Sequence, residues 1–139
     1  MKKSISIIGS TGSIGISSLN IIDKKKKLFK IELLSANKNY KLICYQINKY
    51  KPEFFIITNY LIFKKVKKKF KIKKVKILNN FSSLSLKKKL DITVTAIPGI
   101  AGLEPTIKMI KLSKKILIAN KESIICGWNL IKKAAILNK

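Results

Sequence analysis

Short apolar runs alternate along this chain with segments in which apolar residues recur every three or four positions. The runs lie at residues 4–8, 31–35, 54–58, 91–97 and 116–119. Short runs of this kind are typical of buried strands, and the segments between them have the spacing of amphipathic helices. Apolar strands that alternate with helices are typical of a parallel sheet covered on both faces. The pattern therefore predicts one doubly wound α/β domain over residues 1–139, with a mostly parallel sheet and helices on both faces.

Helical spacing is clear in five segments and weak in one. The five predicted helices lie at residues 13–23, 43–50, 63–70, 103–110 and 124–135. Residues 75–78 read as a short edge strand, and residues 82–89 as a short helix. Trp128 lies in the apolar spacing of the last helix, which predicts a core position for it.

A glycine-rich turn joins the first predicted strand to the first predicted helix. It reads Gly9-Ser10-Thr11-Gly12-Ser13-Ile14-Gly15. A strand, such a turn and a helix in that order are typical of a Rossmann-like dinucleotide site. One glycine permits the tight turn, one lets backbone N–H groups approach a pyrophosphate, and one lets helix and strand pack closely. The helix dipole and the Thr11 and Ser13 hydroxyls would add to the attraction. The alternative is a glycine- and serine-rich loop without a ligand.

Two further loops follow strands at the same predicted edge of the sheet. The loop Asn37-Lys38-Asn39 begins about twenty residues after the turn, where an NAD site usually carries Asp or Glu for the ribose hydroxyls. A lysine suits a 2′-phosphate instead, which favours NADP, although Lys38 could equally be one more surface lysine. Asn120-Lys121-Glu122 follows the last strand and could present an amide and an ammonium to a phosphate-bearing ligand. It could also be only a well-capped helix start.

The charge of the chain is strongly positive. It has 31 basic residues, all Lys, against six carboxylates, for a formal net charge of +25. Abundant Lys, Ile and Asn are typical of an AT-rich coding sequence, so we interpret most lysines as solvated surface. Nucleic-acid sites rely on Arg for bidentate contacts, and this chain has none. A basic nucleic-acid-binding domain stays open as the alternative.

Composition removes several kinds of chemistry. The chain has no His, which excludes Ser-His-Asp and Cys-His catalysis by its own residues. Cys44 and Cys126 fit no metal or redox spacing, which predicts core positions in a reducing compartment. No two of the carboxylates form a paired arrangement, so no metal site is predicted within these residues.

No segment of the sequence reads as a membrane anchor or leader. No apolar run reaches the roughly 18 residues of a membrane span. Met1-Lys2-Lys3 and the apolar run after it faintly resemble a signal peptide, but Gly9 and Ser10 interrupt that run at once. We therefore expect a cytoplasmic protein without a membrane partner.

Four motifs together resemble one enzyme family. They are the glycine turn Gly9–Gly15, the run Ala36-Asn37-Lys38-Asn39, the run Gly99–Thr106 and the run Ala119–Ser123. In this order they are similar to 1-deoxy-D-xylulose 5-phosphate reductoisomerases, over the whole chain. Such enzymes rearrange and reduce a sugar phosphate to 2-C-methyl-D-erythritol 4-phosphate in non-mevalonate isoprenoid biosynthesis. They use NADPH and a divalent metal, Mg or Mn.

The resemblance implies roles for individual residues. The implied NADPH ligands are Thr11, Gly12, Ser13, Ile14, Asn37, Lys38, Asn39, Asn120 and Glu122. Lys121 would contact the sugar phosphate. Asn37 stands where many members have Gly, and Asn tolerates a positive φ, so we expect the site to survive.

Length is the other departure from the family. Family members are about three times as long, and their metal ligands lie beyond the part that matches this chain. The resemblance therefore implies an NADPH-binding domain that is inactive alone and belongs to a possible homodimer when full length. Another NADP-dependent oxidoreductase is the second enzymatic alternative.

Overall fold

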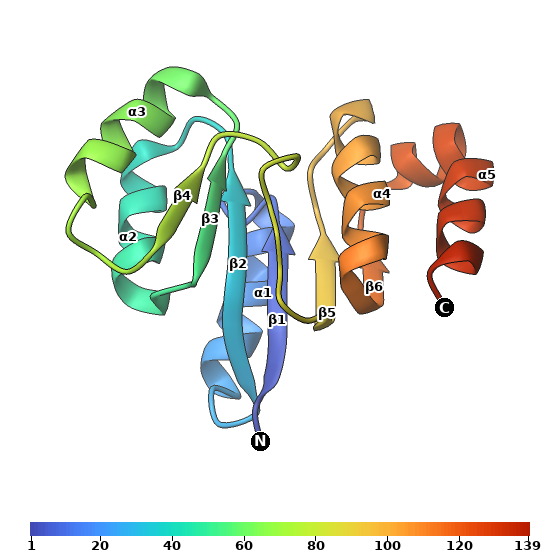
Figure 1. Ribbon diagram of the computed structural model, residues 1–139, viewed down its shortest axis with the longest axis horizontal. Coiled ribbons are helices and arrows are strands. Elements are labelled where there is room, and N and C mark those ends of the chain that lie inside the picture. The colour runs from blue at the N-terminus through green and yellow to red at the C-terminus, as the bar shows by residue number, and fades with distance from the viewer.

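Six strands form one parallel sheet in the computed structural model, which describes residues 1–139 (Figure 1). The strands are β1 (Lys3–Ile8), β2 (Phe29–Ala36), β3 (Phe54–Ile57), β4 (Lys76–Leu78), β5 (Leu90–Thr95) and β6 (Ser113–Ile118). Their spatial order is β4-β3-β2-β1-β5-β6, and every pair is parallel. The sheet confirms the predicted doubly wound α/β fold, and β4 is the edge strand expected at residues 75–78.

The chain order reverses beside β1. Strands β1 to β4 step outward to one edge, and the chain then returns to place β5 against the free side of β1. Loops that leave β1 and β5 at their carboxyl ends therefore diverge, and ligands of this fold bind in the crevice between them.

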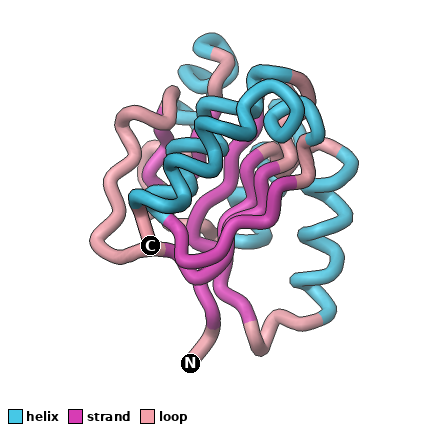
Figure 2. The backbone as a smooth tube through the Cα atoms, turned by 90° about the vertical axis from the view of Figure 1, so that its right-hand side faces the viewer, coloured by secondary structure: helices cyan, strands magenta, loops and turns pink.

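Five α-helices and one short 3₁₀ turn connect the strands. They are α1 (Ser13–Lys24), α2 (Tyr40–Tyr50), α3 (Tyr60–Lys69), η1 (Ile100–Gly102), α4 (Leu103–Leu112) and α5 (Lys121–Leu137). The tube view shows helices on both sides of the sheet (Figure 2). No helix is both long and apolar enough to cross a bilayer.

Each face of the sheet has its own core. Helices α1, α2 and α3 cover the larger one, whose centre includes Ile7, Leu34 and Phe55. On the other face, Met109 of α4 and Leu84 pack against neighbouring strands. Helix α5 lies outside α4, since its buried stripe packs on α4 rather than on the central strands.

The predicted helix at residues 82–89 is wrong. These residues form part of an irregular crossover that runs from the carboxyl end of β4 to the amino end of β5, and the side chain of Leu84 within it is buried. The Asn80 side chain accepts hydrogen bonds from the backbone N–H and the hydroxyl of Ser83, which ties the start of the segment into a turn. An eight-residue helix would rise only about 12 Å, too little for this crossover, whereas the same residues extended reach about 26 Å.

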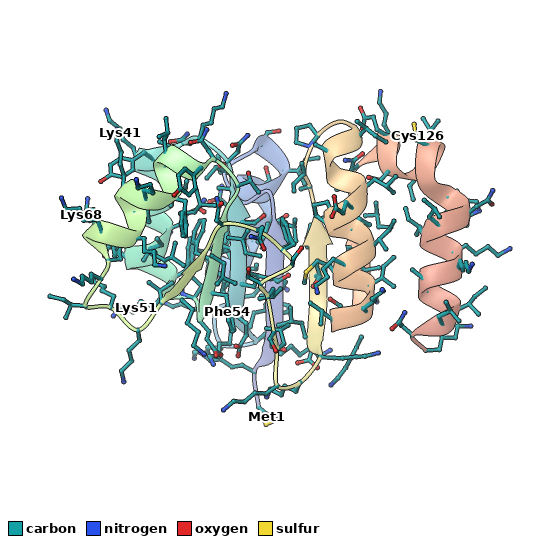
Figure 3. The ribbon with its side chains drawn as sticks, turned by 45° about the horizontal axis from the view of Figure 1, so that its top comes forward. Met1, Lys41, Lys51, Phe54, Lys68 and Cys126 are labelled. Carbon is teal, nitrogen blue, oxygen red and sulfur yellow. The ribbon has the colours of Figure 1, made fainter.

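Two predicted core side chains are exposed. Cys44 is buried on α2 as expected, but Cys126 lies at the surface of α5 (Figure 3). Trp128 is 53% exposed. The buried stripe of α5 runs through Gly127 and Ile131, and Trp128 lies about 100° around the helix from Gly127.

The lysines occupy the surface, as interpreted from the composition. All are exposed except Lys108, which is half-buried. Lys41, Lys51 and Lys68 illustrate this at the periphery of α2 and α3 (Figure 3).

Candidate functional site

Two glycines of the first turn are required by the protein's own packing. Gly9 has a φ of +91°, and a Cβ there would lie 2.8 Å from the Ala96 carbonyl oxygen. At Gly15 a Cβ would lie 2.2 Å from the Gly9 carbonyl oxygen. These contacts confirm the predicted tight turn and the predicted close approach of helix to strand.

Gly12 differs from both, because nothing inside the protein requires it. Its φ is −78°, and the atom nearest to a Cβ would be the Gly9 carbonyl oxygen at 3.7 Å. No side chain caps α1, and the backbone N–H groups of Ser13 and Ile14 donate to no group of the protein. The start of α1 therefore leaves free donors and the positive end of a helix dipole at the crevice.

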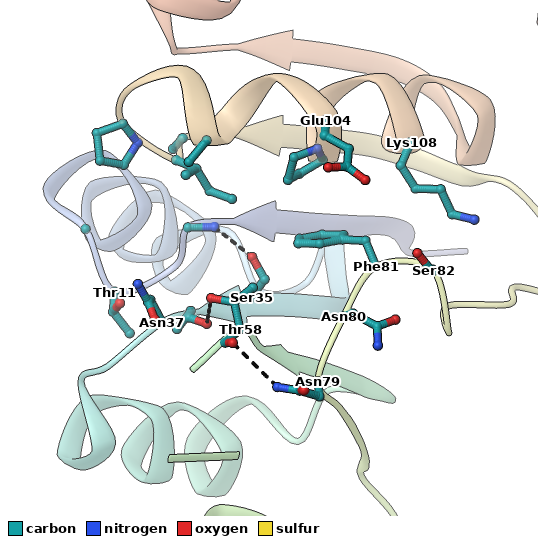
Figure 4. A pocket seen from close by; sticks show the side chains of 18 residues that line it. Thr11, Ser35, Asn37, Thr58, Asn79, Asn80, Phe81, Ser82, Glu104 and Lys108 are labelled. Atoms are coloured by element: carbon teal, nitrogen blue, oxygen red, sulfur yellow. Dashed lines mark hydrogen bonds between the residues drawn. The ribbon is translucent and has the colours of Figure 1, made fainter. Parts of the chain in front are cut away.

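Two cavities meet at this helix start. The larger has a volume of about 700 Å³ and is bordered by the loops after β1, β2 and β5 and by the crossover before β5 (Figure 4). The smaller, of about 330 Å³, lies between the start of α1 and the start of α5. Gly12, Ala96 and Pro98 line both cavities. The two cavities therefore adjoin at Gly12.

The loop after β2 contributes unequally to the larger cavity. Asn37 lines it beside Thr11 (Figure 4). Lys38 is exposed next to it and forms no ion pair. The Asn39 side chain accepts from the Leu42 backbone N–H at 3.1 Å and so caps α2.

The loop after β6 borders the smaller cavity. Its lining includes Ser13 and Ile14 on one side and Asn120, Lys121 and Glu122 on the other. Asn120 is only 4% exposed. Its side-chain oxygen accepts from the Ser123 N–H, and its amide nitrogen donates to the carbonyls of Ile97 and Gly99. Asn120 therefore caps α5 and fixes the loop after β5, while Lys121 remains an exposed cation.

Several polar residues that line the larger cavity were not predicted from the sequence. They are Thr58, Asn79, Asn80, Ser82, Glu104 and Lys108. Asn79 donates to the Ile57 carbonyl at 2.9 Å and so joins the ends of β3 and β4. Residues that directly follow strands lie at the carboxyl edge of a parallel sheet, and this position could have identified Thr58 and Asn79. Glu104 and Lys108 occupy one side of α4, for which the sequence carried no comparable signal.

Gln46 was also missed, although it touches the glycine turn. It lies on α2, is 2% exposed, and hydrogen-bonds Ser10 through both ends of its amide. A polar residue inside the apolar stripe of Ile43 and Ile47 was the available signal.

Metal-ligating side chains do not gather anywhere in these residues. No three His, Cys, Asp or Glu side chains lie close enough to hold one ion. Apart from the single carboxylates Glu104 and Glu122, one in each cavity, the crevice offers backbone N–H groups, amides and lysines. This donor set suits phosphate groups rather than a divalent cation.

Comparison with known proteins gives one consistent result. A family model described as 1-deoxy-D-xylulose 5-phosphate reductoisomerase matches residues 5–127. The reductoisomerase of Pelagibacter ubique is 52% identical over 135 residues, which cover 94% of this chain and 35% of that protein. That of Wolbachia pipientis from Culex pipiens is 39% identical, over 96% of this chain and 35% of that protein. The chain thus spans about a third of the length of these relatives.

Solved structures agree with the sequence comparison. The reductoisomerase from Zymomonas mobilis in complex with NADPH superposes with a TM-score of 0.89 at 26% identity, covering 99% of this chain and 37% of that one. A reductoisomerase in complex with NADPH, fosmidomycin and magnesium also gives 0.89, at 27% identity, covering 98% of this chain and 34% of that one. The shared region is the whole α/β sheet described above.

Proposed function

This chain belongs to the 1-deoxy-D-xylulose 5-phosphate reductoisomerase family, and from this premise we propose that residues 1–139 are the NADPH-binding domain of such an enzyme. The observation that carries the proposal is the bare N-terminus of α1 where two cavities adjoin. A dinucleotide has the matching form, since its pyrophosphate lies between two nucleoside halves.

The pyrophosphate would bind at Gly12 and the free N–H groups of Ser13 and Ile14, with Thr11 beside it. Gly12 fits this role because its open side is the one place on the turn where a ligand could replace a Cβ. The adenosine half would occupy the larger cavity, which extends over the end of β2, the strand that contacts the adenosine ribose in this fold. The nicotinamide half would occupy the smaller cavity, between Ile14 and Glu122.

NADP would be preferred over NAD because of the loop after β2. No carboxylate is present there, and Lys38 stands exposed between two asparagines. An ammonium attracts a 2′-phosphate, whereas the carboxylate of a typical NAD site would repel it. Asn37 and Lys38 would contact this phosphate. Asn39 would hold the loop through its cap on α2 and lie within reach of the same group.

The activity that we propose for the whole enzyme is the rearrangement and NADPH-dependent reduction of 1-deoxy-D-xylulose 5-phosphate. Bound NADPH supplies the hydride for the reduction. The residues described here would bind and orient that cofactor, and Lys121 would hold the phosphate of the sugar at the nicotinamide end. Asn120 would fix both loops of that end through its three hydrogen bonds.

The donor set of these residues is unsuited to a divalent metal. We therefore assign its ligands to the part of the relatives that this chain does not span, and we derive no step through it. This predicts a chain that binds NADPH without turning over the sugar phosphate. A cytoplasmic location and a dimeric full-length enzyme are part of the same proposal.

A calorimetric titration of the 139-residue chain with NADPH and with NADH, at about 0.15 M salt, tests the proposal. We expect saturable one-to-one binding with a clear preference for NADPH. Failure to bind either nucleotide would overturn the cofactor role, and equal affinity would overturn the role of Lys38. Titration with an RNA oligomer is the control, since merely electrostatic binding weakens steeply as salt rises.

A further inference from the structure

A buried polar cluster holds the glycine turn. Its members are Ser10, Ser35 and Gln46, which are 0%, 2% and 2% exposed. Of these, only Ser35 lines one of the two cavities. The Ser35 carbonyl accepts from the backbone N–H of Ser10 at 2.7 Å and of Gly9 at 3.1 Å. The Ser35 hydroxyl accepts from the same Gly9 N–H at 3.0 Å (Figure 4). Strand β2 therefore fixes the first half of the turn.

Gln46 fixes the turn from the other side. Its side-chain nitrogen donates to the Ser10 carbonyl at 2.9 Å, and its side-chain oxygen accepts from the Ser10 hydroxyl at 2.6 Å. The carbonyl can only accept, which sets the orientation of the amide. The hydroxyl has one proton, and its 2.6 Å distance to Gln46 is shorter than its 3.1 Å distance to the Ser35 carbonyl. Gln46 is therefore its main partner.

Ser10 stands two residues before Gly12, in the part of the turn that hydrogen bonds from β2 and α2 hold. The Gly12 N–H donates to the Gly9 carbonyl at 3.3 Å, the Gly12 carbonyl accepts from the Ile16 N–H at 2.9 Å, and Gly12 has no close neighbour. The direction of the free N–H groups of Ser13 and Ile14 therefore depends on where Ser10 is held. A small rotation of the Ser10 peptide would turn those donors away from a phosphate, and oriented donors lose their value quickly with angle.

We propose that Gln46 is a positioning residue for the pyrophosphate end of the cofactor site, acting through Ser10. The proposal rests on the cofactor role put forward above and adds a residue that would touch no part of the ligand. Gln46 would lower the stability of the fold, because it places an amide in the apolar helix stripe between Ile43 and Ile47. An apolar residue there would leave the Ser10 carbonyl without its partner.

The test uses two ligands that differ in the pyrophosphate. NADP⁺ engages the glycine turn, whereas adenosine 2′-monophosphate carries only the 2′-phosphate and the nucleoside. In Gln46→Met we expect the affinity for NADP⁺ to fall about tenfold, the size of an ordinary hydrogen bond. The affinity for adenosine 2′-monophosphate, followed by NMR titration, should stay within about twofold of the unsubstituted chain.

Ile47→Val is the matched control on the same helix. It removes a buried methyl group from a residue that is 1% exposed, so it should lower the melting temperature without changing either affinity. If Gln46→Met folds poorly, Ser10→Ala provides a second variant, because it removes the hydroxyl contact and keeps the carbonyl bond. It should give a smaller loss, of about threefold, for NADP⁺ alone.

Each outcome has one meaning. An unsubstituted chain that fails to bind NADP⁺ overturns the cofactor role itself. If that chain binds and both variants bind NADP⁺ as tightly as it does, the positioning role of Gln46 is overturned. Equal losses for both ligands, matched by Ile47→Val, would reduce Gln46 to a residue of general stability and would also overturn the proposal.

Discussion

Helices α1 and α2 begin at the same edge of the sheet, each directly after a strand, yet their N-termini are completed differently. The N-terminus of α2 is capped by the Asn39 side chain, which accepts a hydrogen bond from the Leu42 N–H at 3.1 Å. The end of α1 has Gly12 at the same position and no capping side chain. Asparagine also caps α3 and α5, through Asn59 and Asn120. Helix α4 also lacks a side-chain cap, but it continues directly from the 3₁₀ turn η1. At the bare N-terminus of α1, a bound phosphate would supply the missing acceptors.

Giving α1 the cap that it lacks should have the largest effect. In Gly12→Asp, we expect the affinity for NADPH to fall by about 100-fold, or about 2.7 kcal/mol, because a carboxylate would take the free N–H groups and repel the pyrophosphate. The free energy of unfolding should rise by a few tenths of a kcal/mol, roughly the advantage of Asp over Gly at an N-cap. Calorimetry and thermal denaturation measure the two quantities.

Gly12→Ala is the control for bulk without charge. The backbone at Gly12 accepts any residue, and a methyl group there meets nothing closer than 3.7 Å. It should weaken NADPH less than Asp does and should not stabilise α1. If Gly12→Asp bound NADPH as well as the unsubstituted chain, the end of α1 would not be a phosphate site.

The cap of α2 tests the opposite case. Asn39→Ala should lower the free energy of unfolding by about 1 kcal/mol, because the Leu42 N–H loses its acceptor. Asn39→Asp keeps an acceptor and should keep the stability. Its added charge should lower NADP⁺ affinity by about tenfold while leaving NAD⁺ affinity unchanged, if the 2′-phosphate lies at this loop.

The two variants of Asn39 are each other's control. A loss of NADP⁺ affinity that followed stability rather than charge would show that Asn39 only caps the helix. The same titrations with NAD⁺ report whether the effect belongs to the 2′-phosphate.

Lys38 should have a smaller effect because it is exposed to solvent. In Lys38→Ala we expect NADPH affinity to fall about fivefold, or about 1 kcal/mol, the upper range of an exposed ion pair. NADH affinity should not change. The loss should shrink as salt is raised, since exposed charges are screened. Lys68→Ala, at an exposed position near the end of α3, is the matched control and should change neither affinity.

The contrast between α1 and α2 also marks how far the sequence could be read. The strands were predictable because they are short apolar runs, and the glycine turn because Gly9 and Gly15 meet backbone atoms that no side chain could approach. The roles of Asn39 and Asn120 as caps agree with general rules for helix starts, which is why capping and binding could not be separated from sequence alone.

Other features depend on tertiary contacts that no local pattern encodes. Residues 82–89 carry apolar residues that suit a helix as well as an extended crossover, and only the position of β5 beside β1 decides between them. Trp128 has helical spacing but lies off the stripe that packs on α4. Gln46 is a polar residue in an apolar stripe, but its partner Ser10 is distant in sequence, so the sequence did not reveal the contact between them.

Asp91, at the amino end of β5 and away from the crevice, is the position where a substitution should have the smallest effect. It therefore serves as a reference for the other variants. The Asp91 carboxylate accepts from Lys114 at 2.7 Å and from the Ser4 backbone N–H at 2.9 Å. The Lys114 ammonium, together with the backbone N–H and the hydroxyl of Ser4, holds the pKa of Asp91 well below its usual range. Because the folded pKa is depressed, the carboxylate stabilises the fold above the ordinary carboxyl pKa of about 4, and this contribution is lost as the pH falls below it.

Asp91→Asn should therefore lower the free energy of unfolding slightly at pH 7. The gap in this free energy between the unsubstituted chain and the variant should narrow below about pH 4. Urea unfolding at several pH values measures it. Asp91 lies at the start of β5, at the edge of the sheet opposite the crevice, so NADP⁺ affinity at pH 7 should not change. A gap independent of pH would mean that the substitution acts through packing rather than ionisation. A changed NADP⁺ affinity would mean that a small loss of stability far from the crevice is enough to alter binding. The affinity changes measured for the variants of Gly12, Asn39 and Lys38 would then have to be corrected by the change measured for Asp91→Asn.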